Sequence, residues 1–120
     1  MTRILTIDDS RTMLDLLKAA LSKEGFDVIQ AENGQAGIDM LDRHEVDVVI
    51  TDINMPIMNG IQFIKAARSK PRHQALPILI LTTESGREKR DEGREAGGTG
   101  WIVKPFDPEK LVRVVRKVIQ

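Results

Sequence analysis

Five short apolar segments, rich in isoleucine and valine, alternate along the chain with segments whose apolar residues follow helical spacing. Each apolar segment is too short for a buried helix and is typical of a strand buried on both faces. Strict alternation of strands and helices predicts an α/β fold: a doubly wound, five-stranded parallel sheet covered by helices on both faces. The five predicted strands are Arg3–Ile7, Phe26–Ala31, Val46–Thr51, Leu76–Thr82 and Gly100–Val103.

Capping residues mark where most of the intervening helices begin and end. A first helix is expected between an N-cap at Ser10 and a stop at Gly25. A second follows the cap residue Asn33, and a third is expected over Gly60–Ser69. The last helix has the clearest start, because Asp107 is a cap residue and a proline follows it at the first helical position.

The predicted fourth helix differs from the others in composition. The pattern Ser85-x-x-Glu88 predicts a capping box at its start. The segment 87–95 has eight charged residues and Gly93, and Ala96 is the one apolar anchor nearby. We therefore expect a weakly held helix, and both a solvated surface helix and a mobile element fit this pattern.

Length and composition restrict the class of protein. The 120 residues predict one domain, spanning 1–120. Equal numbers of acidic and basic residues give no overall field for binding nucleic acid or a membrane surface, and no apolar stretch is long enough to span a bilayer. The absence of cysteine excludes disulfides and thiolate zinc sites and agrees with a cytoplasmic location. The two histidines, His44 and His73, match no motif and are expected to be exposed.

Polar residues of types that bind ions or react with substrates stand at the ends of four of the five predicted strands. Asp8 and Asp9 follow the first strand, Asp52 the third, and Lys104 the fifth, while Thr82 ends the fourth. In open parallel sheets, ligands bind outside the carboxyl ends of the strands. Three carboxylates, a hydroxyl and an ammonium group are therefore expected at one edge of the sheet.

Electrostatics limits what such a cluster can do. Two carboxylates about 5 Å apart repel by roughly 3 kcal/mol at an effective dielectric constant near 20, and one lysine offsets only part of the repulsion among three. Either one aspartate takes up a proton or a divalent cation binds. Because the candidate ligands are all oxygens, the expected cation is Mg²⁺, or Mn²⁺ in its place.

These residues, in register over the whole chain, resemble the receiver domain of bacterial two-component response regulators. The stretch Thr51-Asp52-Ile53-Asn54-Met55-Pro56 is most similar to stand-alone, chemotaxis-type receivers. The resemblance implies the flavodoxin-like strand order 2-1-3-4-5, which is known from the chemotaxis receiver itself. It also implies a cis peptide bond between Lys104 and Pro105.

The resemblance implies a role for each carboxylate. Asp52 matches the phosphoacceptor, which a sensor histidine kinase or a small phosphodonor converts to an aspartyl phosphate. Asp9 and Asp52, with the backbone carbonyl of Asn54, match the direct ligands of Mg²⁺, and Asp8 matches a ligand that acts through water.

Other positions match parts of the switch. Lys104 matches the cation that pairs with the phosphoryl group, and Thr82 matches the hydroxyl that binds one of its oxygens. Trp101 stands where the family most often has a tyrosine or phenylalanine that turns inward on activation. Asn54 and Glu84 match positions that influence how long the phosphoryl group survives.

The function implied is a phosphorylation-activated switch that assists its own phosphorylation and dephosphorylation without being an enzyme. Because the chain stops after its fifth predicted helix, with no room for an attached module, output is expected through binding. The receiver is expected to be a monomer. The expected partner is an output protein such as the flagellar motor switch, at the face of the fourth helix, fifth strand and fifth helix. A phosphorelay intermediate and a phosphate sink remain alternatives. A phosphatase with an aspartate nucleophile is disfavoured, because Asn54 stands where a second carboxylate is needed.

Overall fold

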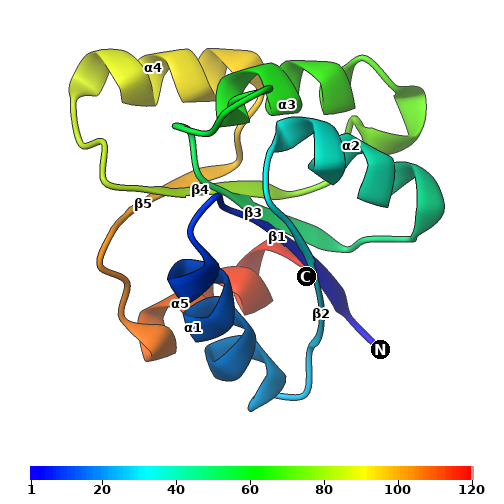
Figure 1. The fold of residues 1–120 in the computed structure, drawn as a ribbon, viewed down its shortest axis with the longest axis vertical. Helices are drawn as coiled ribbons and strands as arrows, with labels where there is room; N and C mark the ends of the chain where they lie inside the picture. The colour runs from blue at the N-terminus through cyan, green and yellow to red at the C-terminus, as the bar shows by residue number, and fades with distance from the viewer. Residues whose placement is uncertain (120) are drawn as a thin grey trace.

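The computed structural model describes residues 1–119 and contains one parallel sheet with the strand order β2-β1-β3-β4-β5 (Figure 1). This order is the one that the resemblance predicts. The strands are β1 (Arg3–Ile7), β2 (Asp27–Ala31), β3 (Val48–Thr51), β4 (Ile78–Thr82) and β5 (Gly100–Val103).

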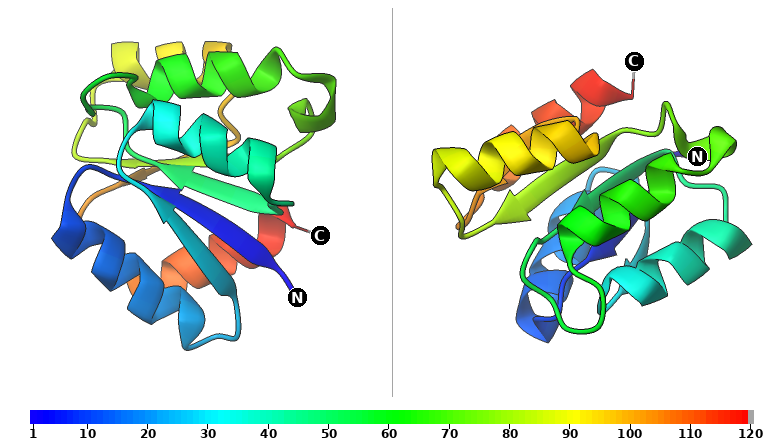
Figure 2. Two further views of the ribbon diagram at one scale, coloured as in Figure 1. Left: turned by 45° about the vertical axis from the view of Figure 1, so that its right-hand side comes forward. Right: turned by 90° about the horizontal axis from the view of Figure 1, so that it is seen from above.

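Five α-helices cover both faces of the sheet. Figures 1 and 2 show α1 and α5 on one face and α2, α3 and α4 on the other. A short 3₁₀ helix, η1, follows α3. The helices are α1 (Arg11–Ser22), α2 (Gly34–Arg43), α3 (Gly60–Arg68), η1 (Pro71–His73), α4 (Arg87–Ala96) and α5 (Pro108–Val118).

Three strands begin later than the apolar patterns predict. The residues Phe26, Val46 and Leu76 precede β2, β3 and β4 and pack against the core without being part of a strand. Strand pairing starts only after these residues: β3 begins at Val48, and β4 begins at Ile78, directly after Pro77. Apolar sequence therefore reports burial more faithfully than it reports strand pairing.

Most of the helices have an N-cap residue whose side chain hydrogen-bonds to the first turn. Ser10, Asn33 and Asp107 each accept a hydrogen bond from a backbone N–H in the first turn of their helix, as predicted. Asn59 and Gln62 form a reciprocal capping box at the start of α3 that the sequence analysis did not identify.

Two helix boundaries differ from the predictions. The predicted capping box at Ser85 is wrong: α4 begins one residue later, after Gly86, and within residues 1–119 no side chain caps it. Helix α1 ends at Ser22, before the predicted stop at Gly25, which adopts a φ of 88° in the turn that follows. At this turn the backbone needs the left-handed region, which glycine enters without steric cost.

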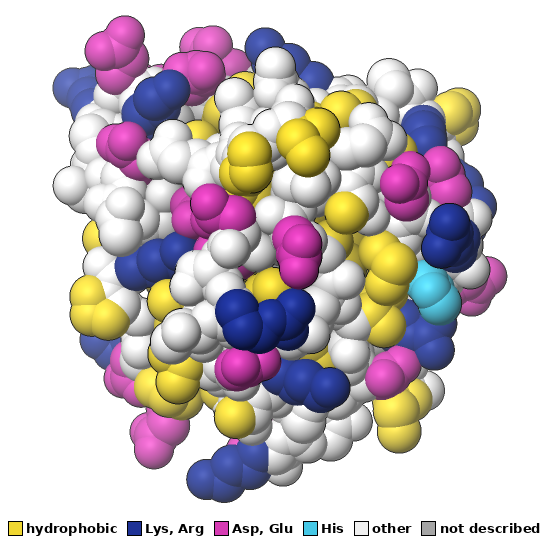
Figure 3. Space-filling view, viewed as in Figure 1, with side chains coloured by type: hydrophobic (Ala, Val, Ile, Leu, Met, Phe, Trp, Pro, Cys, Tyr) yellow, Lys and Arg dark blue, Asp and Glu magenta, His cyan; other side chains and the backbone are white. Residues whose placement is uncertain are grey.

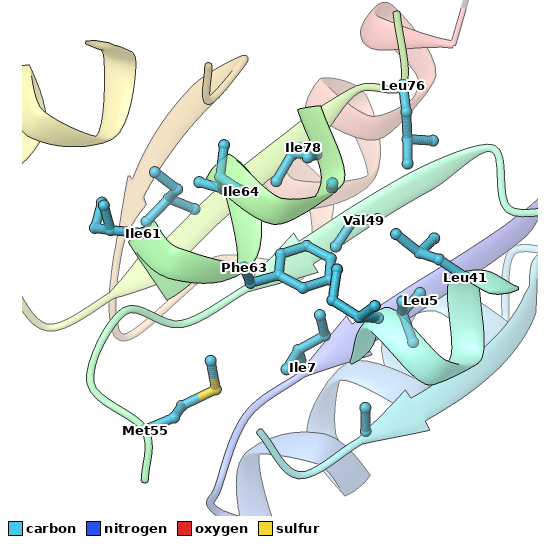
Figure 4. Packing of buried hydrophobic residues seen from close by; sticks show 14 of the residues in the cluster. Leu5, Ile7, Leu41, Val49, Met55, Ile61, Phe63, Ile64, Leu76 and Ile78 are labelled. Atoms are coloured by element: carbon cyan, nitrogen blue, oxygen red, sulfur yellow. The ribbon is translucent and has the colours of Figure 1, made fainter. Parts of the chain in front are cut away.

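Two apolar layers fill the space between the sheet and its helices. Phe63 of α3 is fully buried among side chains of the central strands, including Leu5, Ile7 and Val49 (Figure 4). On the opposite face, α1 and α5 bury leucines and valines against β1, β3 and β4. Within residues 1–119, no helix is both long and apolar enough to cross a bilayer.

The environment of His73 contradicts the prediction of an exposed side chain. His73 is only 6% exposed, and its Nε2 atom has no hydrogen-bond partner among the described residues. Burial lowers the pKa of His73, and the nearby Arg72 and Lys70 lower it further, so the neutral imidazole is favoured. The sequence pattern missed this because η1 turns the side chain toward the protein. His44 is half-buried.

Gly60 permits a close approach between the start of α3 and the end of β3. A Cβ atom at this position would lie 2.0 Å from the backbone oxygen of Asp52. We predict that Gly60→Ala lowers the free energy of unfolding by about 2 kcal/mol or more, because backbone atoms must move to relieve the overlap. Urea unfolding followed by circular dichroism measures this change.

Gly86→Ala is the matched control. Nothing lies within 4 Å of a Cβ atom at Gly86, whose φ of −68° suits alanine. It is expected to change the free energy of unfolding by less than about 1 kcal/mol. Equal losses in the two variants would contradict the steric argument.

Candidate functional site

The parallel register brings the ends of separate strands together at one edge of the sheet. Strands β1 and β3 pair with Ile7 opposite Thr51, so Asp8 and Asp52 leave the sheet from adjacent positions. Strand β5 ends directly before Lys104. Residues far apart in the chain therefore meet in a small region outside the carboxyl ends of the strands.

The three aspartates form one cluster. Carboxylate oxygens of Asp8, Asp9 and Asp52 all lie within 4.8 Å of one another. Asp8 and Asp52 are buried, whereas Asp9 is exposed. The backbone N–H of Ser10 donates to Asp8 Oδ1 at 2.9 Å, and that of Ile53 donates to Asp52 Oδ1 at 2.7 Å, so both buried carboxylates are held in place.

Lys104 bridges the two buried carboxylates. Its Nζ atom donates to Asp8 Oδ2 at 2.7 Å and to Asp52 Oδ2 at 2.9 Å. Burial raises the pKa of Asp8, and the hydrogen bonds from Lys104 and the Ser10 N–H offset this only in part. Burial by itself would lower the pKa of Lys104, but hydrogen bonds to Asp8 and Asp52 outweigh it and raise that pKa. The lysine therefore stays protonated.

One ammonium group does not balance three carboxylates, so the site keeps an excess of negative charge when all three are ionised. The candidate ligands are hard oxygen atoms without histidine or cysteine. This donor set fits Mg²⁺ or Mn²⁺, and Asp9 faces solvent, from which a hydrated ion arrives.

A second group of contacts surrounds Glu84, in the loop between β4 and α4. Thr82 is fully buried, and its hydroxyl accepts a hydrogen bond from the Glu84 N–H at 3.3 Å. The Glu84 carboxylate accepts from Asn54 Nδ2 at 3.3 Å, and the Glu84 carbonyl accepts from Trp101 Nε1 at 3.1 Å. The positions predicted for the switch and for phosphoryl lifetime thus belong to one connected set.

Helix α4 rests on this set through a small contact. Of its ten residues only Gly93 is buried. A Cβ atom there would lie 2.7 Å from Ile80 and 3.0 Å from the ring of Trp101, so only glycine lets the helix approach the indole. Charged side chains of both signs intermix over the outer surface of α4 (Figure 3). A hollow of about 500 Å³ between α4 and β5 is lined by Trp101 and by Arg87, Arg90 and Arg94, among others.

Arg68, on α3, is a residue that the sequence analysis missed. Its guanidinium donates twice to the carbonyl of Gly97, the C-cap of α4, at 3.1 and 2.8 Å, and once to the carbonyl of His73, at 2.6 Å. It therefore ties the end of α4 to α3 and η1. No sequence signal distinguishes this arginine from a solvated one, because its partners are backbone carbonyls far along the chain.

Fold and site together define a class of protein: a flavodoxin-like doubly wound domain with an acidic site bridged by a lysine at the carboxyl edge of its sheet. The Lys104–Pro105 peptide is cis, as the resemblance predicts.

Comparisons with known proteins identify the family. The model of the response regulator receiver domain matches residues 4–116. The chain is 39% identical over 119 residues to a chemotaxis protein CheY homolog of Campylobacter jejuni, covering 98% of this chain and 92% of that protein. It is 40% identical over 119 residues to the chemotaxis protein CheY1 of Helicobacter pylori, covering 98% and 96%. The solved structure of Vibrio cholerae chemotaxis protein CheY4 superposes with a TM-score of 0.94 at 39% identity, covering 98% of each chain.

The chain belongs to the response regulator receiver family and is similar to its CheY-type chemotaxis members. Membership implies phosphorylation-dependent signalling, with a sensor kinase upstream and a target downstream. Receiver domains typically bind Mg²⁺ at an acidic pocket, and the group of three aspartates provides such a pocket.

The lysine bridge generates a stability prediction. Lys104→Met leaves two buried carboxylates without their cation, so we expect a loss of about 3 kcal/mol in the free energy of unfolding at pH 7 without divalent ions. The loss should shrink as pH falls from 7 to 5. Burial raises the pKa of Asp8, and the variant lacks the lysine hydrogen bond that lowers it in part, so the folded variant binds a proton more readily than the unfolded chain and acid stabilises the variant relative to the wild type. Urea unfolding at each pH measures both effects.

Lys70→Met is the control for this experiment. Lys70 pairs with Asp42 at the surface at 2.7 Å, where 36% of the lysine side chain and 53% of the aspartate side chain are exposed. We expect a loss below about 1 kcal/mol. A loss for Lys104→Met no larger than that of the control would contradict the role of the bridge.

Proposed function

We propose that this chain is a single receiver domain, residues 1–120, that accepts a phosphoryl group on Asp52 from a sensor histidine kinase and signals through altered partner binding. The observation that carries the proposal is the bridge from Lys104 Nζ to Asp8 and Asp52. It holds a cation against the acceptor carboxylate, at the place where the charge of an incoming phosphoryl group develops.

In this proposal Asp52 is the nucleophile. Its Oδ1 atom is held by the Ile53 N–H and its Oδ2 atom by Lys104, so the carboxylate is oriented before the donor arrives. When the phosphoryl group joins Asp52, Lys104 exchanges a carboxylate oxygen for a phosphoryl oxygen. The Thr82 hydroxyl would bind a further phosphoryl oxygen and give up its contact with the Glu84 N–H.

Asp9 and Asp52, with the carbonyl of Asn54, would hold Mg²⁺ or Mn²⁺ directly, and Asp8 would act through water. The ion supplies charge neutralisation that lets an anionic donor approach an anionic acceptor. The clustering of the three carboxylates within 4.8 Å supports this assignment. Asn54 and Glu84, which contact each other beside the cluster, would influence how fast water reaches the phosphoryl group.

Output would come from the face formed by α4, β5 and α5. Withdrawal of Thr82 from the Glu84 N–H would disturb the loop that also accepts the Trp101 hydrogen bond, and α4 rests on that indole through Gly93. Similarity to CheY proteins favours chemotaxis in the cytoplasm, with the flagellar motor switch as the partner and a monomeric receiver. A phosphorelay intermediate or a phosphate sink is the second candidate, since both use the same acceptor chemistry.

Phosphorylation of Asp52 is the central test. With Mg²⁺ and acetyl phosphate, mass spectrometry should find one phosphoryl group, labile to acid and base, on Asp52. EDTA should abolish labelling, and Mn²⁺ should restore it, because an oxygen-ligated divalent ion is required. Asp52→Asn should retain the fold and take no label.

Asp39→Asn, at an exposed carboxylate on α2, is the control and should be labelled like the wild type. A label on Ser10, Thr82 or either histidine would overturn the assignment, and so would labelling that persists without any divalent ion.

Trp101 is the only tryptophan in a chain without tyrosine, so its fluorescence is nearly free of background from other residues. We expect Mg²⁺ with beryllofluoride, a phosphoryl mimic, to change the emission, because recruitment of Thr82 disturbs the loop that holds the indole N–H. Thr82→Ala should lose the response, while Thr82→Ser, which keeps a hydroxyl, should retain it.

Mg²⁺ alone is the reference titration for each protein. An equal response to beryllofluoride in Thr82→Ala and the wild type would show that Trp101 serves packing and that the switch lies elsewhere.

A further inference from the structure

The loop between β3 and α3 contains a strained residue with an exposed apolar side chain. Ile57 has a φ of 71°, and the N–H of Met58 donates to the carbonyl of Pro56 at 2.8 Å across it. This hydrogen bond from residue i+2 to residue i, with positive φ at the centre, defines a γ-turn of the rare, strained kind. The Ile57 side chain is 82% exposed.

Isoleucine is a poor residue for this position. Its branched Cβ atom clashes with the backbone at positive φ, where glycine or asparagine is tolerated. The other described residues with positive φ, Gly25 and Gly97, are both glycines. The turn cannot relax, because the Gly34 N–H holds the Met58 carbonyl at 2.9 Å and the Gly60 N–H holds the Ile53 carbonyl at 2.9 Å. The folded protein thus bears both backbone strain and an exposed apolar side chain.

We propose that Ile57 is the apolar anchor by which the phosphodonor domain of the histidine kinase docks on this receiver, an inference that rests on the proposed function. Ile57 lies five residues after Asp52, so its Cα atom is within about 18 Å of the acceptor's. The loop projects from the body at the carboxyl edge of the sheet (Figure 2, right). A typical partner covers roughly 800 Å² of each surface, a patch about 30 Å across, so Ile57 lies within reach of a domain that presents phosphohistidine to Asp52.

The charge of the site leaves room for an apolar anchor. With a divalent ion in the proposed site, the charges of the ion and of Lys104 balance those of the three aspartates, so the acceptor site attracts the donor little by charge. Contacts beside the acceptor that do not depend on charge would then supply binding energy for the encounter. Ile57, next to the exposed Pro56 and the half-buried Met58, offers such a contact, and burying it in a partner pocket recovers the transfer free energy of its side chain.

Three substitutions separate the side chain from the strain. Ile57→Leu keeps an apolar side chain, Ile57→Ala removes it and keeps a Cβ atom at positive φ, and Ile57→Asn removes it and relieves the strain. Each protein is phosphorylated in two ways, by acetyl phosphate with Mg²⁺ and by a purified, autophosphorylated histidine kinase. The kinase used is the one that transfers fastest to the wild type in a panel from the same genome.

With the kinase, kcat/KM should fall at least about tenfold in Ile57→Ala and Ile57→Asn, mainly through KM, and stay near wild type in Ile57→Leu. Rates with acetyl phosphate should stay within about twofold in all three. Ile57→Asn should melt at a higher temperature than Ile57→Ala, so lost transfer in the more stable variant cannot reflect unfolding. The defect should persist at high salt, because the lost contact is apolar.

Other outcomes overturn the inference. Equal kinase transfer to Ile57→Asn and the wild type removes Ile57 from the docking surface, while the proposed function stands if acetyl phosphate labels Asp52. Loss with both donors means that the substitutions disturb the acceptor site, which also overturns the anchor. If sedimentation finds a wild-type dimer that dissociates in Ile57→Asn, the side chain contacts a second copy of the chain and not the kinase. A wild type that accepts phosphate from neither donor overturns the proposed function and this inference together.

Discussion

The contact between Lys104 and two buried carboxylates is the interaction on which the arrangement of the site depends. Asp8 and Asp52 come from neighbouring strands and lie at hydrogen-bonding distance from the same ammonium group. Without that cation, burial of both carboxylates in their ionised form would oppose folding. With it, the site remains acidic enough to attract a divalent ion. The same contact thus permits burial of both carboxylates and leaves an acidic site of the kind at which receiver domains typically bind Mg²⁺.

The path from this site to the surface runs through few contacts. Glu84 joins Thr82, Asn54 and Trp101 through separate atoms, so one loop contacts both the residues at the ends of β3 and β4 and the indole. Helix α4 contributes little packing of its own, because only Gly93 among its residues is buried. Arg68 holds the C-terminal end of the helix through the carbonyl of Gly97. A helix with so small a buried surface has a small free-energy difference between its positions, which suits a switch element.

The fold was predictable from local features because each is a property of a short segment. Alternating apolar runs indicate the parallel sheet, and cap residues such as Ser10 and Asp107 mark helix starts in the structure. Predictions failed where the surrounding structure, and not the residue type, decided where a helix begins or whether a side chain is buried. Ser85 has the residue type of a cap, but the helix begins after Gly86, and His73 is buried by a 3₁₀ turn that no periodicity reveals.

The sequence by itself determined which chemical groups stand at the strand ends, since the aspartates and Lys104 follow apolar runs at recognisable points. Only the tertiary structure decided that Lys104 contacts both Asp8 and Asp52, that Arg68 holds Gly97, and that Ile57 stands exposed at positive φ. The physical reason is the range of the interactions. Periodicity and capping act within a few residues, whereas Lys104 and Asp8 are 96 residues apart and meet only through the order of the strands.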